Sequence, residues 1–235
     1  TRLRDNVGTQ RKVFSMGQQG DKAREILMDA AEELFATHGI DAVSNRKIAE
    51  RAGTANHSAI AYHFGNRDEL IRALINRHLG QLEGRKAELI AGLGDSATLS
   101  DVIACRVLPW VESLESMPHP SWRARFLYQI RTIPSVAAVF ISSFEVNDDF
   151  DILLDTVRGQ LEGIPEAVLR ARAGVLGHMA LGICAEYESQ IHEGSDEGSW
   201  LSVGYFLIDA GAGMLSAPVT HPGKFLAPPR TPTLI

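Results

Sequence analysis

Cysteine is scarce in this sequence, and long apolar runs are missing. Cys105 and Cys184 are the only two cysteines among the 235 residues. They form neither a C-x-x-C pair nor a metal-binding pattern, so we expect buried thiols in a reducing cytoplasm. A redox sensor using either thiol is the alternative. No apolar run reaches the length of about 18 residues that a membrane span needs, and the first residues show no hydrophobic signal region. We therefore expect a cytoplasmic protein without a membrane partner.

The motifs of the common enzyme classes are also missing. G-x-S-x-G, the Walker phosphate loop, H-E-x-x-H and G-x-G-x-x-G do not occur. The eight histidines are scattered without ligand-like spacing. His178 lies within an apolar helical stretch, where a hydrogen-bonded core histidine is commoner than a ligand contact. We predict no enzymatic activity, no cofactor and no metal ion.

Charge is unevenly distributed along the chain. The formal net charge is -6, but residues 1–72 carry +1 and the remainder carries -7. The cations of the first part cluster within residues 1–12 and 44–51. Since a local basic cluster matters more for nucleic-acid binding than the total charge, the N-terminal third is the candidate DNA-binding part.

Apolar residues recur with helical spacing, and alternation typical of strands is missing, so we predict an all-α fold. An N-terminal three-helix domain with a helix-turn-helix, residues 21–66, would precede a larger helical regulatory and dimerisation domain, residues 67–217. Residues 1–20 contain four cations against Asp5. They are expected to form a flexible basic arm that reaches DNA, or a leader without a role. Residues 218–235 form a proline-rich tail.

The chain is organised around residues 44–70. Ser44 is a good N-cap for a first helix, and Gly53 is suited to its C-terminal end. Asn56 is expected to cap a second helix over residues 57–63, and Asn66 a third helix. Two short helices joined by a glycine-containing turn form a helix-turn-helix unit.

The positions of the cations favour a role in DNA binding over that of solvated surface charges without a partner. Arg46 and Lys47 lie in the first turn of their helix, where the helix dipole disfavours cations, and Arg67 has a similar position. Bound phosphate would compensate these charges. Lys22 and Arg24 near the start of the preceding helix are further candidates for phosphate contacts.

The sequence resembles the TetR family of bacterial transcription regulators in three stretches: residues 23–44, residues 47–53 and above all the run AIAYHFGNRDEL, residues 59–70. The turn is one residue longer than the usual family pattern. The resemblance implies a ligand-responsive regulator, expected to be a repressor, that binds a near-palindromic double-stranded operator as a homodimer. The residues expected to bind DNA are Ser44, Arg46, Lys47, Asn56, His57, Ser58, Tyr62, His63 and Arg67.

The C-terminal part is predicted to consist of helices interrupted by loops and prolines. One helix is expected from residue 66 to residue 91, and Pro109 is expected to end or kink a helix over residues 99–116. Two long helices, residues 165–192 and 199–216, are apolar on more than one face. The family resemblance implies that they pair with a second copy; burial within the chain is the alternative. The expected interface residues are Leu169, Ala173, Leu176, Ala180, Ile183, Tyr187, Leu201, Tyr205, Ile208, Ala212 and Leu215.

Glu186 and Glu188 are expected to face solvent or the dimer edge. A regulatory body would hold a largely apolar small-molecule effector, although aromatic residues in a helical body are more often plain core. The candidate lining residues are Trp110, Met117, Trp122, Phe126, Phe140, His178 and Met179. A helical small-molecule-binding or interaction module without specific DNA binding is the second functional hypothesis.

Overall fold

The computed structural model describes residues 2–131, 150–194 and 198–220, which form helices and loops without a strand in those ranges. The all-α prediction is therefore confirmed for this part of the chain. The chain divides into two compact units, residues 1–74 and residues 75–235. The division falls inside helix α4 (Arg67–Leu79), not at residue 66, because Leu70, Ile71 and Leu74 of that helix are buried with the first unit.

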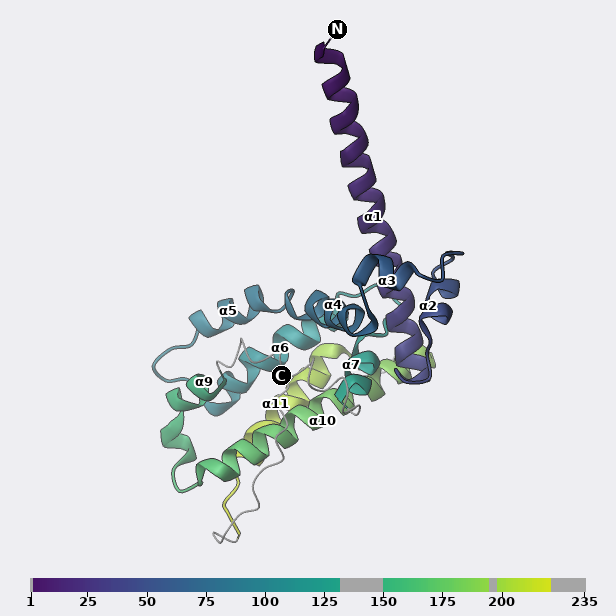
Figure 1. Ribbon diagram of the computed structural model, residues 1–235. Helices are drawn as coiled ribbons and strands as arrows, with labels where there is room; N and C mark the ends of the chain where they lie inside the picture. The colour runs from purple at the N-terminus through teal and green to yellow at the C-terminus, as the bar shows by residue number, and fades with distance from the viewer. Residues whose placement is uncertain (1, 132–149, 195–197, 221–235) are drawn as a thin grey trace. The chain divides into compact units, whose positions relative to one another are not determined.

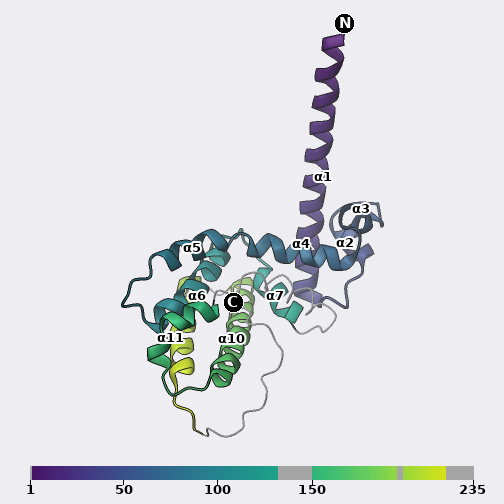
Figure 2. The ribbon, with the colours of Figure 1, turned by 60° about the vertical axis from the view of Figure 1, so that its left-hand side comes forward.

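The first unit contains α1 (Arg2–His38), α2 (Asn45–Arg51), α3 (Ala59–Phe64) and the start of α4. Figure 2 shows α2 and α3 lying against the C-terminal part of α1, and contacts join all three helices. Its core consists of apolar side chains from every helix and from the loop after α1: Leu27, Ala31, Phe35, Ile40, Val43, Ile48, Ile60 and Leu70.

Helix α1 is longer than predicted, because it begins at Arg2 and not near residue 21. The expected flexible arm over residues 1–20 is therefore helical from its second residue. The segment contains glycines but no proline. A glycine costs about 1 kcal/mol in a helix interior and does not block it, whereas proline would. Figure 1 shows this part of α1 extending beyond α2 and α3.

The second unit contains α5 (Glu83–Ala91), α6 (Leu99–Glu115), α7 (Arg123–Arg131), α9 (Phe150–Thr156), a 3-10 helix (Arg158–Leu161), α10 (Glu166–His192) and α11 (Trp200–Ser216). Helix α11 packs against α6 and α10, and α7 packs against α10. Figure 1 shows α10 and α11 running side by side. The stretch predicted as one helix from residue 66 to residue 91 is instead α4 and α5, interrupted near Gly80.

Pro109 does not end α6, which continues past it from Leu99 to Glu115. Proline removes one backbone hydrogen bond and costs about 3 kcal/mol or more in a helix interior. The packing of α11 against α6 offsets this cost. The two helices approach so closely that a Cβ added at Gly204 would lie 2.8 Å from Val111 Cγ2.

Helix α10 is the one helix in the described ranges that is long and apolar enough to cross a membrane by composition. Its mean hydropathy over 18 residues is 1.2. Core helices of ordinary globular domains pass the same test. Because α10 packs against α7 and α11 in its own unit, we interpret its composition as that of a packing helix.

Candidate nucleic-acid interface

Helix α2 begins and ends as its sequence predicts. Ser44 is the N-cap, and its Oγ accepts a hydrogen bond from the backbone N–H of Lys47 at 3.2 Å. At the other end Gly53 has a φ of 71°. Its N–H bonds to the carbonyl of Glu50, and the N–H of Thr54 bonds to the carbonyl of Ala49. This pair of bonds is a Schellman motif, in which glycine takes the left-handed conformation without strain.

The two cations of the first turn of α2 differ in their surroundings. Arg46 Nε lies 2.8 Å from Glu50 Oε1, and both side chains are largely exposed. The hydrogen bond from Arg46 lowers the pKa of Glu50. Exposed pairs of this kind contribute little to stability, so Arg46 can exchange Glu50 for another anion. Lys47 is half-buried and has no ion-pair partner within the described residues.

The turn between α2 and α3 holds its shape with its own side chains. Thr54 Oγ1 accepts a hydrogen bond from the N–H of Asn56, and Asn56 Oδ1 accepts one from the N–H of Ser58 at 3.0 Å. Asn56 thus closes a local turn, a common alternative for asparagine to capping a helix. Helix α3 begins at Ala59, with Ser58 as N-cap. The prediction that Asn56 caps a helix over residues 57–63 is therefore wrong, and His57 and Ser58 lie in the turn.

Helix α3 buries Ala59, Ile60 and Phe64 and leaves its other side to solvent. The side chain of Tyr62 is 80% exposed, a large value for an aromatic residue without a binding partner. Its ring meets that of His63 edge-on, with the centroids 4.9 Å apart. Together with the exposed side chains of His57 and Ser58, these residues form the exposed face of the helix-turn-helix.

Asn66 caps α4 as predicted, since its Oδ1 accepts a hydrogen bond from the N–H of Glu69 at 2.9 Å. Arg67 does not resemble a phosphate-binding cation. Its guanidinium donates to the carbonyl of Ile40 and to Asn45 Oδ1, and it lies over the Phe35 ring. Burial lowers the pKa of this guanidinium. The structure thus places Arg67 within its own domain, in contrast to the DNA contact expected from the sequence.

Arg24 is likewise directed inward. Its Nη1 donates to the carbonyl oxygen of His63 at 2.7 Å, and its guanidinium carbon lies 4.3 Å from the centre of the Phe64 ring. The sequence placed this arginine among candidates for phosphate contacts because only its charge was visible. Arg51 pairs with Glu33 on α1, with a shortest distance of 2.6 Å. Three arginines therefore connect the helices of the domain to one another.

A family model described as "Bacterial regulatory proteins, tetR family" matches residues 27–74. This range contains α2, the turn and α3. The helix-turn-helix of this chain is thus similar to that of the TetR family.

Two relatives illustrate the extent of the likeness. The chain is 33% identical over 81 residues to the HTH-type transcriptional repressor KstR2 of Rhodococcus jostii (strain RHA1), covering 34% of this chain and 39% of that protein. It is 36% identical over 72 residues to the HTH-type transcriptional repressor Rv3405c of Mycobacterium tuberculosis (strain ATCC 25618 / H37Rv), covering 31% of this chain and 36% of that protein. The matches thus span less than two fifths of the length of these relatives.

The candidate effector residues of the second unit do not share one set of contacts. Trp110 and Phe126 are buried, and the Phe126 ring lies 6.3 Å from that of His78. Trp122 lies against His192, with ring centroids 4.2 Å apart. His178 Nδ1 is 2.6 Å from the carbonyl of Gly174 on its own helix, which satisfies it locally. Met117 and Met179 are half-buried, and Phe140 lies outside the described residues.

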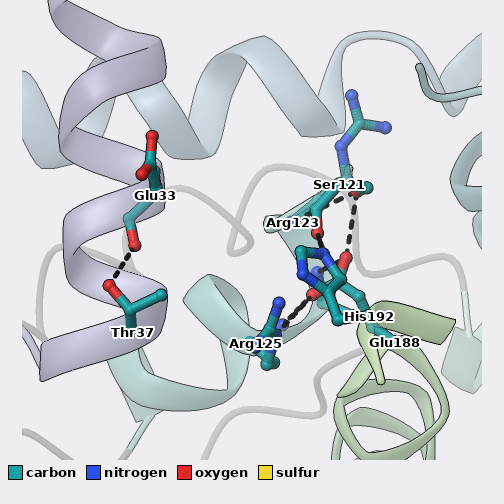
Figure 3. A network of polar contacts seen from close by, with 8 residues as sticks. Glu33, Thr37, Ser121, Arg123, Arg125, Glu188 and His192 are labelled. Atoms are coloured by element: carbon teal, nitrogen blue, oxygen red, sulfur yellow. Dashed lines mark hydrogen bonds and ion pairs between the residues drawn. The ribbon is translucent and has the colours of Figure 1, made fainter. Parts of the chain in front are cut away.

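Glu188 is 1% exposed and buried within the chain, contrary to the expectation that it faces solvent or the dimer edge, whereas Glu186 is exposed. The Glu188 carboxylate accepts hydrogen bonds from Ser121 Oγ and from the backbone N–H groups of Ala124 and Arg125. Figure 3 shows this carboxylate directed at the start of α7. An anion at a helix N-terminus satisfies N–H groups that have no partner within the helix. Glu188 therefore connects α10 to α7.

The residues expected at a dimer interface fall into two groups. Ala173, Leu176, Ala180, Ile208 and Leu215 are buried within the chain, so the prediction that they face a second copy is wrong. Packing within the unit covers this side: a Cβ added at Gly211 would lie 3.0 Å from Leu176. Leu169, Ile183, Tyr187 and Ala212 are half-buried, while Leu201 and Tyr205 are exposed. The large apolar side chains of these two helices that are exposed are Val175, Leu201, Tyr205 and Phe206.

Both cysteines are buried. Burial raises the pKa of Cys184 to about 12, and a hydrogen bond from the Trp110 indole acts in the opposite direction. Burial also raises the pKa of Cys105. Because the thiolate is the form that reacts with oxidants, this environment disfavours the redox-sensor alternative.

Proposed function

We propose that this chain is a transcription regulator that binds duplex operator DNA through the exposed face of its helix-turn-helix. The observation that carries the proposal is the arrangement in the first unit: Arg46 and Lys47 at the start of α2, and exposed polar side chains on the adjoining turn and on α3. Its TetR-type relatives are named transcriptional repressors, which supports repression as the direction of regulation. We propose no catalytic role.

Within this interface we assign two roles. Ser44, Arg46 and Lys47 hold phosphates, which give affinity without sequence preference. His57, Ser58, Tyr62 and His63, together with the Asn56 amide, contact the DNA groove, with His57 and Ser58 closest to base edges. Arg67 is left out of the phosphate set, because its guanidinium already contacts Ile40, Asn45 and Phe35.

We further propose that the regulator is a homodimer. The exposed apolar side chains of α11, Leu201, Tyr205 and Phe206, are 38%, 55% and 57% exposed. Such aromatic residues are enriched at protein interfaces. A two-fold symmetric dimer would place its recognition helices in successive major grooves, about 34–36 Å apart, on a near-palindromic site.

The second unit would bind a largely apolar effector that shifts the equilibrium between DNA-binding and released states. An effector has this effect only if its affinity differs between the two states. Thermal stabilisation of the purified chain by a panel of apolar compounds, followed by release of the operator, tests this part. A compound that stabilises the chain without changing DNA affinity would contradict it.

The DNA-binding proposal is tested by selection of bound sequences from random duplex DNA, followed by a salt titration with the selected site. We expect an inverted-repeat consensus and binding that weakens steeply with salt. Failure to enrich any sequence, with weak and uniform binding, would favour the alternative of a helical ligand-binding module without specific DNA binding.

A further inference from the structure

The recognition helix α3 depends on the rest of its domain for its orientation. It has only six residues, and isolated helices shorter than about 12 residues are marginal in water. Its N-cap Ser58 makes no side-chain cap hydrogen bond. The last carbonyl groups of the helix accept no hydrogen bond from an N–H group within it, and they carry partial negative charge. A group from another helix that binds these carbonyls would fix the direction of α3.

Arg24 of α1 is such a group. Its Nη1 donates a 2.7 Å hydrogen bond to the carbonyl of His63, which is 39 positions later in the chain. The same guanidinium lies 4.3 Å from the centre of the Phe64 ring. A guanidinium combines several in-plane donors with a flat face that stacks on aromatic rings, so it makes both contacts at once. One side chain thus holds the backbone and the buried ring at the end of α3.

The alternative role for Arg24 is a direct phosphate contact, which its charge alone suggests. The structure disfavours this role, because the guanidinium is half-buried and directed at α3. Lys22, two residues earlier on α1, is exposed and provides a matched comparison. A phosphate contact supports binding to every DNA sequence, whereas orientation of α3 affects only the reading of bases.

We infer that Arg24 is a positioning residue for sequence-specific binding: it sets the orientation of α3, and with it Tyr62 and His63, without contacting DNA. The inference rests on the proposed function. Loss of Arg24 should therefore lower the preference for the operator and leave the affinity for an unrelated duplex unchanged. Loss of a cation that binds phosphate would lower the affinity for both.

The experiment compares the full chain with the variants Arg24→Gln, Arg24→Lys and Lys22→Gln. Dissociation constants are measured for the selected operator and for an unrelated duplex over a range of salt concentrations. For Arg24→Gln we expect about tenfold weaker operator binding, unchanged binding to the unrelated duplex and an unchanged salt slope. Arg24→Lys keeps the charge but loses the planar contact, so we expect an intermediate loss. Lys22→Gln should leave operator preference intact.

A fall of about 0.9 in the salt slope on both duplexes would assign Arg24 to a phosphate and overturn the inference. Undiminished operator preference in Arg24→Gln would overturn it as well. If that variant does not fold, the lysine variant carries the test.

Hydrogen exchange without DNA separates this inference from the proposed function. We expect faster exchange of the amides of Phe64 and Gly65 in the Arg24 variants than in the unmodified chain, whether or not an operator exists. Unchanged exchange at these amides would overturn the inference even if the chain binds an operator.

Discussion

The guanidinium carbon of Arg67 lies 4.8 Å from the centre of the Phe35 ring, joining the first residue of α4 to the core of α1. Further hydrogen bonds from Arg67 reach Ile40 and Asn45, the first residue of α2. Arg67→Ala should therefore lower the free energy of unfolding by about 1–3 kcal/mol, through lost hydrogen bonds and ring contact. Unfolding of the chain in urea, followed through the fluorescence or the hydrogen exchange of the first unit, measures this loss.

The matched control for Arg67 is Arg72, whose ion pair with Glu69 is exposed and has a length of 3.6 Å. Arg72→Ala should change stability by no more than about 0.5 kcal/mol. Equal stability of the Arg67→Ala variant and the unmodified chain would contradict the internal role of Arg67.

Glu188 should be important for the stability of the second unit. Its carboxylate accepts hydrogen bonds from Ser121 and from two N–H groups of α7, and it lies 3.4 Å from Arg125 Nε. Glu188→Ala leaves these donors without an acceptor, so we expect a loss of about 3–5 kcal/mol. Denaturant unfolding measures it, with the exposed Glu186→Ala as control. A loss for Glu188→Ala no larger than that of the control would contradict the buried network.

The thiol of Cys184 should resist ionisation in the folded chain. Its pKa is raised to about 12, whereas a free thiol ionises near pH 8.5. The unfolded state therefore binds fewer protons than the native state between about pH 9 and pH 12. The contribution of this thiol to the free energy of unfolding is constant below pH 8. It falls between about pH 9 and pH 12, by about 1.4 kcal/mol per pH unit.

Thermal unfolding from pH 7 to pH 10 tests the Cys184 prediction, with Cys184→Ala as the comparison. The alanine variant should lose less stability as the pH rises. A thiol reagent at pH 8 should react with Cys184 only after unfolding, and rapid reaction of the native chain would contradict the buried environment.

The exposed aromatic side chains of α11 should mediate self-association. Phe206 is 57% exposed, so Phe206→Glu should fold normally but place a charge in an apolar interface. We expect it to convert a dimer into a monomer in sedimentation velocity measurements. Ser116→Glu, at an exposed position after α6, is the control and should remain dimeric. A Phe206→Glu variant that stays dimeric would show that the interface does not include this part of α11.

The local features of the fold could be predicted from the sequence. Ser44, Gly53 and Asn66 have the helix-terminal roles that short-range rules assign to them. Asn56 was assigned the wrong role, because a cap and a local turn use the same side-chain oxygen and differ only in backbone path.

The non-local contacts could not be predicted in this way. Arg24 and Arg67 have the same charge as phosphate-binding arginines, and only the folded chain shows that His63 and Ile40 accept their hydrogen bonds. Glu188 is separated from Ser121 by 67 positions, so no local pattern indicated its burial. Ala173, Leu176 and Ala180 of α10 were expected to face a second copy, but packing within the chain buries them.

The most direct test of the account is the salt dependence of operator binding by Arg46→Ala/Lys47→Ala, compared with that of the unmodified chain. If both side chains bind phosphate, the slope of the logarithm of affinity against that of salt concentration should fall by up to about two, on operator and unrelated duplex alike. His57→Ala should instead keep the slope and lose preference at particular base pairs. An unchanged slope in the double variant would contradict the assignment of α2 as the phosphate-binding helix.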